Sequence, residues 1–233
     1  MLEAAFTKKL RDFTMDLSFQ VRDGEILALM GNNGSGKSTT LNIIAGLLVP
    51  DTGRVRLNGT LLSDHADGLS LPMEDRRIGY VFQNAAAFPH LSVSENIAYG
   101  LRARGLPRTE ISERVGQLMD MMHLGDLADV RAANLSGGQK QRTALARAIA
   151  IRPALLMMDE PFSSLDVEST IGVKELTRTI VTKMQIPCIV VTHRVADSQE
   201  IGDRVIVLCS GKKEWEGSPR EIPDTCTVCH CHG

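Results

Sequence analysis

Short apolar runs recur along the chain and predict buried β-strands. They cover residues 26–30, 78–82, 155–158, 189–191 and 205–208. Between several of these runs the apolar residues lie three or four positions apart, which is the spacing of one face of a helix. Strands that alternate with helices indicate an α/β fold with a mixed, mainly parallel sheet.

The first third of the chain also contains strand patterns of a different kind. Apolar residues at every second position from 13 to 19 predict an antiparallel strand, which we expect to pack beside the strand at 26–30. Residues 55–57 predict a short strand, and the Asn-Gly pair at 58–59 is a hairpin signal. The polar stretch 63–77 predicts a loop. Together these patterns indicate an antiparallel β subdomain.

Helical spacing replaces the strand-like runs in the middle of the chain. Apolar residues recur at this spacing from Val93 to Leu101 and again from Ile111 to Met122. We therefore expect a helical subdomain inserted at about residues 84–135, within one domain that spans residues 1–222. The alanine-rich stretch 139–150 predicts one more helix.

Charge and hydropathy narrow the choice of partners. The 233 residues carry a formal net charge of −2, so the global charge does not suggest a nucleic-acid partner. No apolar run approaches the length of a membrane span, and the first residues lack the basic start and long apolar stretch of a signal peptide. We expect a chain on the cytoplasmic side of the membrane that does not bind nucleic acid.

Residues 31–39 match the phosphate-loop (P-loop) pattern G-x-x-x-x-G-K-[ST] between a predicted strand and a predicted helix. The glycines let the backbone turn its N–H groups toward a phosphate chain, and the positive end of the following helix faces the same anion. Lys37 would reach the β- and γ-phosphates of ATP, and Ser38 would bind Mg²⁺. The candidate nucleotide-binding residues are Gly31, Asn32, Asn33, Gly34, Ser35, Gly36, Lys37, Ser38 and Thr39.

Asp159 and Glu160 follow directly after an apolar run that predicts a strand. A carboxylate at the C-terminal end of such a strand holds the Mg²⁺ that bridges the β- and γ-phosphates, so we expect Asp159 to be a metal ligand. Glu160 is placed to act as general base on a water in line with the γ-phosphate. These residues predict an ATPase built on a P-loop NTPase core.

Residues 135–139, with the sequence Leu-Ser-Gly-Gly-Gln, form a second glycine-rich stretch at the start of a predicted helix. Such a helix terminus binds anions through its exposed N–H groups. One ATP does not need two of these termini from a single chain. We therefore expect the second terminus to serve the ATP of another copy in a homodimer. Its candidate residues are Ser136, Gly137, Gly138 and Gln139.

With these motifs in this order, residues 1–220 resemble an ATP-binding-cassette (ABC) ATPase. The resemblance includes Gln83, the segment Ser-Ser-Leu-Asp that ends at Asp166, and His193. It implies that Gln83 senses Mg²⁺ and the attacking water, and that Ser136 and Gly138 contact the γ-phosphate in trans. It also implies that Asp166 couples two sites and that His193 holds the γ-phosphate and Glu160. The candidate catalytic residues are Glu160, His193, Gln83 and Lys37, and the candidate Mg²⁺ ligands are Ser38, Gln83 and Asp159.

Residues 71–83 are similar to a segment of molybdate importer ATPases, and residues 88–97 resemble the segment that follows Gln83 in importers of this family. The resemblance implies a peripheral subunit on the cytoplasmic face of the cell membrane. Its partners would be an integral membrane permease and, indirectly, a solute-binding protein. Molybdate or tungstate is the expected solute, with sulfate, another anion or a metal as alternatives. A soluble ABC ATPase acting on DNA or ribosomes is a further alternative, and an inactive cassette is disfavoured because Lys37, Glu160 and His193 are all present.

Two features depart from the pattern of this family. Leu10 stands where many ABC ATPases have an aromatic residue that stacks on adenine. We expect either weaker stacking of the base, or stacking supplied by Phe6 or Phe13. The tail, residues 223–233, contains a set of soft ligands that would suit Zn²⁺ or Cu⁺, unless it binds no metal at all. These are Cys226, Cys229, His230, Cys231 and His232.

Overall fold

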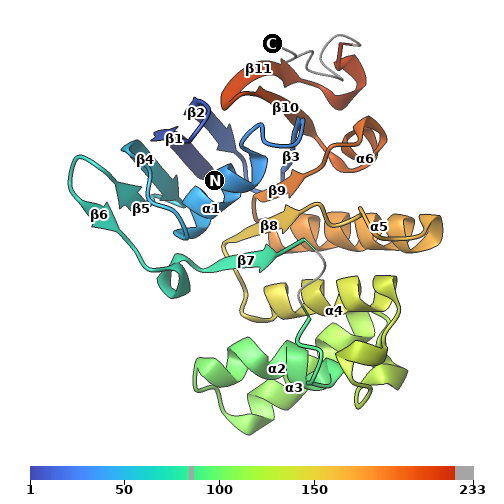
Figure 1. Ribbon diagram of the computed structural model, residues 1–233. Coiled ribbons are helices and arrows are strands. Elements are labelled where there is room, and N and C mark those ends of the chain that lie inside the picture. The colour runs from blue at the N-terminus through green and yellow to red at the C-terminus, as the bar shows by residue number, and fades with distance from the viewer. Residues whose placement is uncertain (84–86, 224–233) are drawn as a thin grey trace.

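The computed structural model describes residues 1–83 and 87–223, and within them the strands form one mixed sheet of eleven strands (Figure 1). The order across the sheet is β6-β5-β4-β1-β2-β11-β10-β3-β9-β8-β7. The strands are β1 (Leu2–Lys9), β2 (Thr14–Val21), β3 (Ile26–Gly31), β4 (Thr52–Leu57), β5 (Thr60–Asp64), β6 (Leu69–Ser70), β7 (Ile78–Val81), β8 (Leu155–Asp159), β9 (Cys188–Val191), β10 (Arg204–Cys209) and β11 (Lys212–Gly217).

The sheet has two parts. Strands β10, β3, β9, β8 and β7 pair in parallel, whereas β1, β2, β4, β5 and β6 pair antiparallel. Because the C-terminal ends of parallel strands meet at one edge, the segments that follow β3, β7, β8 and β9 lie together. The predicted α/β class, with a P-loop core and a mixed sheet, is confirmed.

Six α-helices are present in the described residues. Figure 1 shows α4 between the sheet and the pair α2 and α3. They are α1 (Lys37–Ala45), α2 (Val93–Ala103), α3 (Arg108–Met121), α4 (Gly137–Ala150), α5 (Val167–Met184) and α6 (Val195–Ile201). Helices α2 and α3 pack on α4, and α4 packs on β7. The apolar residues of these helices share one core with buried residues of β8 and β9.

Helices α2 and α3 occupy the middle of the chain, where helical spacing predicts them. The side chain of Ser92 begins α2 by accepting a hydrogen bond from the N–H of Glu95, and the Glu95 carboxylate accepts one from the N–H of Ser92. This reciprocal pair is a capping box, which fixes the start of the helix. The limits of the inserted subdomain at 84–135, of the domain at 1–222 and of the tail at 223–233 stay predictions.

Three expectations about strands and loops are wrong. Strand β2 does not lie beside β3, because the hairpin of β10 and β11 stands between them in the sheet. Strands β1 and β11 were not among the predicted elements, and in β11 the sequence Lys-Lys-Glu-Trp-Glu-Gly hides the strand because its residues are mostly polar and exposed. The stretch 63–77 is not simply a loop, because it holds the end of β5, strand β6 and a 3-10 helix, Met73–Arg76.

Arg76 explains why this polar stretch is ordered. Its side chain is only 2% exposed and donates hydrogen bonds to the carbonyls of Ile43 and Ile44 in the last turn of α1. It also donates to the carbonyl of Leu71. A cation at the C-terminal end of a helix satisfies carbonyls that have no partner within the helix and complements its dipole. Arg76 therefore fixes the end of the helix that follows the phosphate loop.

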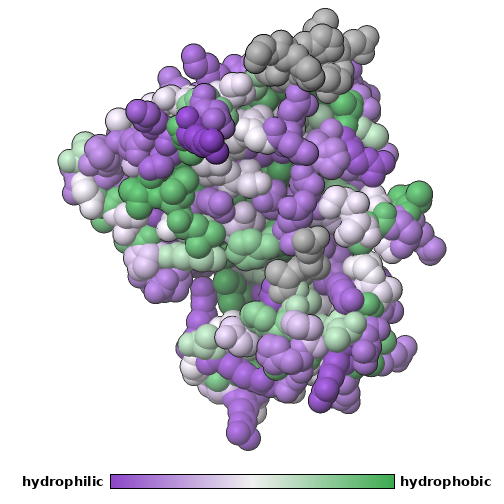
Figure 2. All heavy atoms as spheres, viewed as in Figure 1, coloured by the Kyte–Doolittle hydropathy of each residue, from purple (hydrophilic) through white to green (hydrophobic). Residues whose placement is uncertain are grey.

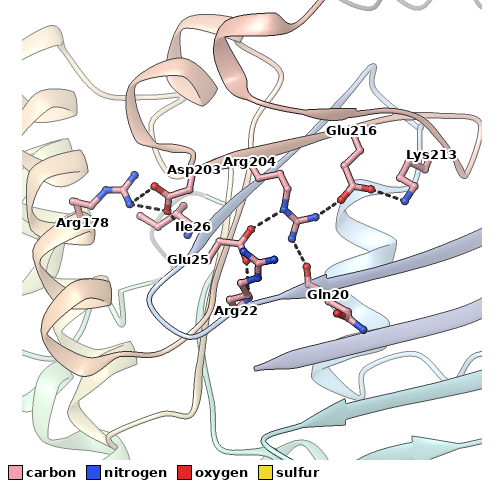
Figure 3. A network of polar contacts seen from close by, with 9 residues as sticks. All are labelled: Gln20, Arg22, Glu25, Ile26, Arg178, Asp203, Arg204, Lys213 and Glu216. Atoms are coloured by element: carbon pink, nitrogen blue, oxygen red, sulfur yellow. Dashed lines mark hydrogen bonds and ion pairs between the residues drawn. The ribbon is translucent and has the colours of Figure 1, made fainter.

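The hairpin of β10 and β11 is joined to its neighbours by a network of charged residues (Figure 3). Arg204 donates to the carboxylates of Glu25 and Glu216, while Arg178 of α5 binds Asp203 at 2.7 and 2.8 Å. These contacts lie where β3 and β10 begin, at the sheet edge opposite the phosphate loop. The pair of Arg204 and Glu25 joins the start of β3, the strand that leads to the phosphate loop, to the start of β10, which lies 179 positions later in the sequence.

Candidate nucleotide site

The phosphate loop follows β3 and has a backbone that only glycine adopts without strain at several positions. The φ angles of Gly31, Gly34 and Gly36 are +145°, +80° and +106°. A Cβ atom on Gly31 would lie 2.3 Å from the carbonyl oxygen of Leu208 in β10. The loop is therefore held tightly against the sheet at its first glycine, while a Cβ atom on Gly34 would meet nothing within 4 Å.

Helix α1 begins at this loop without a side chain to cap it. Its N-cap is Gly36, and no side-chain cap bond is found there in the described chain. The Ser35 hydroxyl is buried and likewise has no partner among the described residues. Free N–H groups at a helix start, with a buried hydroxyl next to them, form a site that an anion can complete.

Lys37 is the first residue of α1, and its side chain folds back over the loop. Its ammonium donates hydrogen bonds to the carbonyls of Gly31 and Asn32 at 2.7 and 2.9 Å. Burial lowers the pKa of Lys37, and the carboxylates of Glu160 and Asp159 oppose this shift. The lysine and both acidic residues are thus electrostatically coupled in one site, although the sequence separates them by more than 120 positions.

Asp159 ends strand β8 and is 8% exposed. Burial raises its pKa, although a hydrogen bond from Ser38 and the charge of Lys37 act in the opposite direction. The structure therefore brings together the hydroxyl and the carboxylate that the sequence predicts as Mg²⁺ ligands. A buried carboxylate with a raised pKa beside a hydroxyl is a position where a bound cation would be favourable.

Glu160 occupies the centre of the site in an unusual backbone conformation. Its φ is +46°, in the left-handed region that a non-glycine residue rarely adopts. Its N–H donates to the carbonyl of Val191 at 3.0 Å, and its own carbonyl accepts from the hydroxyl of Ser163 at 3.1 Å. Strained backbone of this kind is concentrated at functional sites, where surrounding contacts maintain it.

The carboxylate of Glu160 lies between two predicted site residues. Gln83, which follows β7, donates from Nε2 to Glu160 Oε2 at 3.1 Å. His193, which follows β9, places Nδ1 3.3 Å from Glu160 Oε1. Both neighbours are exposed, whereas the Glu160 side chain is 15% exposed. Three strands of the parallel sheet thus bring Gln83, Glu160 and His193 to one point.

The stretch 135–139 is a helix start of another type. Ser136 is the N-cap of α4, and its hydroxyl accepts from the N–H of Gln139 at 3.2 Å, while the Gln139 side chain accepts from the N–H of Ser136 at 2.9 Å. Ser136 and Gly137 are exposed, whereas Gly138 is buried against α5. A Cβ atom on Gly138 would lie 2.4 Å from the Ser169 hydroxyl, so glycine is required there for packing.

Asp166 has a local structural role in addition to the predicted one. Its carboxylate accepts hydrogen bonds from the N–H and the hydroxyl of Ser169, both at 2.8 Å, and so caps α5. These bonds lower the pKa of Asp166. Ser169 thus contacts Asp166 at the start of α5 and packs against Gly138 at the start of α4. It connects the two helix starts.

A family model described as ABC transporter matches residues 14–163. This match covers more than half of the chain and contains the phosphate loop, Gln83 and the 135–139 stretch. The chain belongs to the ABC transporter family.

Curated relatives of this ABC transporter chain are import proteins. The sulfate/thiosulfate import ATP-binding protein CysA of Acinetobacter baylyi is 42% identical over 89% of this chain and 58% of its own length. The CysA of Thermosynechococcus vestitus is 40% identical over 89% of this chain and 60% of its own length. The trehalose/maltose import ATP-binding protein MalK of Thermococcus litoralis is 38% identical, with 90% and 56% covered. The chain thus spans about 60% of the length of these relatives.

Solved structures of ABC proteins share the fold over almost the whole chain. The ATP-binding cassette MJ0796, in a dimeric post-hydrolysis state bound to ADP and Pi, matches with a TM-score of 0.79 and 30% identity over 94% of this chain and 99% of its own. The cbiO1 protein of Clostridium perfringens, part of the ABC transporter complex cbiONQ, matches with a TM-score of 0.84 and 28% identity over 95% of this chain and 89% of its own.

The residues around Leu10 modify the expectation for adenine stacking in this ABC chain. Phe6 is 3% exposed within the core, so its ring is not presented at the surface, and that part of the expectation is wrong. Phe13 and Leu10 are half-buried against the same core. A Cβ atom on Gly211 would lie 2.6 Å from the Phe13 ring, so this ring packs on the turn between β10 and β11.

The turn between β10 and β11 contacts the phosphate loop, and the sequence did not predict this contact. The N–H of Gly211 donates to the carbonyl of Ser35 in the phosphate loop at 3.0 Å, and the Gly211 carbonyl accepts from the N–H of Asp16 at 2.9 Å. The pair Ser210-Gly211 between two strands is itself a turn signal that would have predicted the hairpin.

The proposed metal-binding tail, Cys226 to His232, lies outside the described residues.

No helix in the described parts of the chain is long and apolar enough to cross a membrane. The same residues contain no group of three or more His, Cys, Asp and Glu side chains arranged to hold a metal ion. A Mg²⁺ ion that arrives with a nucleotide does not require such a group. It is held by one or two protein ligands together with phosphate oxygens and waters.

Proposed function

We propose that this chain binds and hydrolyses ATP as the energy-coupling subunit of an ABC importer. The observation that carries the proposal is the Glu160 carboxylate, held by Gln83 and His193 beside Asp159 at the phosphate loop. This arrangement combines an anion-binding helix start, a metal ligand and a positioned base, which are the parts that phosphoryl transfer to water needs. The names of the relatives and the ADP- and Pi-bound neighbour support it.

Each residue of the site then has a defined role. The N–H groups of the loop and the Lys37 ammonium would bind the phosphate chain. Ser38, Asp159 and Gln83 would hold Mg²⁺, which would neutralise charge on the phosphates. Glu160 accepts a proton from the attacking water, and Gln83 orients that water. His193 would contact both the Glu160 carboxylate and the γ-phosphate.

The stretch 135–139 supports a homodimer in which each copy completes the site of the other. The Ser136 hydroxyl accepts a bond within its own helix, so its proton is still available to a phosphate oxygen. The dimeric neighbour, bound to ADP and Pi, supports this arrangement. Asp166, which caps α5 next to Ser169, would couple the two sites of the dimer.

The membrane partner is proposed to be a permease subunit, with this chain peripheral on the cytoplasmic face. The cbiO1 neighbour belongs to such a transporter complex. Large exposed apolar side chains include Leu47, Val49, Met73 and Phe82. Figure 2 shows apolar side chains grouped on the face turned to the viewer, between the sheet and the helical layer. An exposed apolar group of this kind is typical of a protein interface.

For the solute we propose an oxyanion of the sulfate class ahead of molybdate or tungstate. Sulfate/thiosulfate import is in the names of the CysA relatives, and none of the relatives named above is a molybdate importer. The maltose importer MalK is nearly as similar, because the cassette acts on the nucleotide and does not touch the solute. A solute-binding protein would supply the permease, and this chain would meet it only indirectly.

The test is Glu160→Gln, with Glu168→Gln as matched control because Glu168 is an exposed glutamate in the first turn of α5. Loss of the base should lower ATP hydrolysis by about 10²–10⁴-fold and trap a dimer in ATP. The control should hydrolyse ATP at the wild-type rate. A Glu160→Gln protein that stays monomeric in ATP and hydrolyses it normally refutes the proposal, and co-purification with ribosomes or DNA in place of a membrane protein refutes the transport role.

A further inference from the structure

Lys174 is a buried cation in the middle of α5 that the proposed chemistry does not use. Its residue is 7% exposed, and its ammonium binds the Asp197 carboxylate of α6 at 2.7 Å. It also binds Glu200 and lies 5.1 Å from the centre of the Phe162 ring. One side chain thus links three segments of the chain: α6, the segment of Phe162 and its own helix, α5.

Two of these segments lead directly to the candidate site. Phe162 is 1% exposed and comes two residues after Glu160. Asp197 is 3% exposed and comes four residues after His193. The ammonium therefore lies between the segment that carries the proposed base and the loop that carries its histidine partner.

Asp197 also organises the loop of His193. Its second carboxylate oxygen lies 3.4 Å from the hydroxyl of Thr192, which accepts a hydrogen bond from the N–H of Arg194 at 3.1 Å. The residues on both sides of His193 are thus held by a side chain whose buried charge is balanced by Lys174. Arg194 also lies 3.9 Å from the second carboxylate oxygen of Asp197, but its side chain is 55% exposed, so Lys174 is the buried cation of this pair. A buried carboxylate that loses its buried cation is strongly unfavourable, so the loop depends on the pairing with Lys174.

We propose that Lys174 is a positioning residue for ATP hydrolysis: it fixes His193 against Glu160 by holding Asp197 and Phe162 in one arrangement. The proposal rests on the proposed function of the site. The third segment, α5 itself, begins at Asp166 and Ser169, next to the Gly138 contact. A change at that contact therefore has a direct structural route, through α5 and Lys174, to His193.

The experiment compares Lys174→Met with Arg178→Met. Arg178 lies one turn further along α5 and also binds an aspartate, Asp203, but at the opposite edge of the sheet (Figure 3). Lys174→Met should lower kcat by about 10- to 100-fold, because small misplacements of catalytic groups have effects of this size. KM for ATP should change by less than about 3-fold, because the phosphate loop is intact. Arg178→Met should leave kcat within about 3-fold of wild type. Lys174→Arg keeps a positive charge that can pair with Asp197, so it should lose less activity than Lys174→Met, although the larger planar guanidinium does not fit this buried position equally well.

A second measurement keeps the test independent of activity and of folding. The NMR chemical shifts of the His193 ring should move in Lys174→Met and not in Arg178→Met. The double variant Lys174→Met/Asp197→Asn removes both charges, so it avoids an unpaired buried carboxylate and should fold while keeping the low kcat.

The possible failures are distinguishable. If the wild-type chain does not hydrolyse ATP, the proposed function fails, and the His193 shifts still test the positioning role. Lys174→Met with wild-type kcat, or with unchanged His193 shifts, overturns the inference while the proposed function stands. A loss of activity equal to that of Arg178→Met overturns it as well, since it would reflect general destabilisation of α5.

Discussion

Helices α1 and α4 both begin at glycine-rich sequences, but their first turns are built in opposite ways. The start of α1 has a glycine N-cap and no side-chain cap within the described chain, and Lys37 lies over its loop. The start of α4 is closed by the capping box of Ser136 and Gln139. The first terminus leaves its N–H groups for a ligand, whereas the second uses side chains to satisfy part of its own.

The difference teaches what each terminus can bind. The open turn of α1 is electrostatically coupled to Asp159 and Glu160, the proposed metal ligand and the proposed base. The closed turn of α4 brings the Ser136 hydroxyl proton and the exposed Gly137, and its first turn has no acidic residue. A capped terminus is stable without a ligand, which suits a surface that meets a nucleotide only when a second copy docks. The comparison can be tested by changing matched residues in the two helices.

The largest effect is expected from the lysines of the two helix starts. Lys37→Met removes the ammonium from the phosphate loop, so ATP hydrolysis should fall by at least about 100-fold through lost charge stabilisation. Lys140→Met, which changes a lysine in the first turns of α4, should alter it by less than about 3-fold. Steady-state ATPase rates and ATP binding by calorimetry measure both. Equal losses in the two variants would show that α1 has no special role.

The next effect separates two glycines within the α1 loop. Gly31→Ala places a Cβ atom 2.3 Å from the Leu208 carbonyl at a φ of +145° and should destabilise the chain by about 3 kcal/mol. Gly34→Ala is strained only by its φ of +80°, since nothing lies within 4 Å, and should lose about 1 kcal/mol. Urea unfolding curves give both values. A smaller loss for Gly31→Ala than for Gly34→Ala would contradict the close packing of the loop on β10.

A sharper comparison uses the two capping boxes. Ser92→Ala and Ser136→Ala remove equivalent caps, from α2 and α4, so each should lower stability by about 1 kcal/mol. Only Ser136→Ala should also lower ATP hydrolysis, by about 10-fold, because its hydroxyl is proposed to reach the ATP of the partner copy. ATP binding to the monomer should be the same in both. If the two variants lose activity equally, the 135–139 stretch acts on its own helix alone.

Features that one contiguous stretch of the sequence encodes could be predicted, whereas contacts between residues far apart in the sequence could not. The phosphate loop, Asp159 and the 135–139 stretch could be predicted because each is a contiguous motif at the end of an apolar run or the start of a helix. Arg76 could not, since nothing in a polar stretch indicates that an arginine will be buried at the end of α1. The pairing of Lys174 with Asp197 is equally hidden, because only the packing of α5 on α6 brings these residues together.

The smallest effect concerns the charge of Asp159, and its sign follows from burial. The pKa of this carboxyl in the folded chain lies above the ordinary value of 3.8. Between those two pKa values the folded state binds more protons than the unfolded state, so stability falls as pH rises through this window and stays reduced above it. Asp159→Asn removes that penalty, so at neutral pH and without nucleotide it should be more stable than wild type by on the order of 1 kcal/mol.

The gain from Asp159→Asn should shrink as the pH falls and vanish below 3.8, where the wild-type carboxyl becomes protonated in both states. Asp166 supplies a control of opposite sign, because hydrogen bonds from Ser169 lower its pKa and its ionised form therefore stabilises the fold above the ordinary value. Urea unfolding as a function of pH should show Asp166→Asn losing stability at neutral pH. If both variants respond alike, burial beside the phosphate loop is not what sets Asp159 apart. The starts of α1 and α4 would then differ only in how they are capped. Asp159 would not be a carboxylate that a bound cation stabilises next to the start of α1.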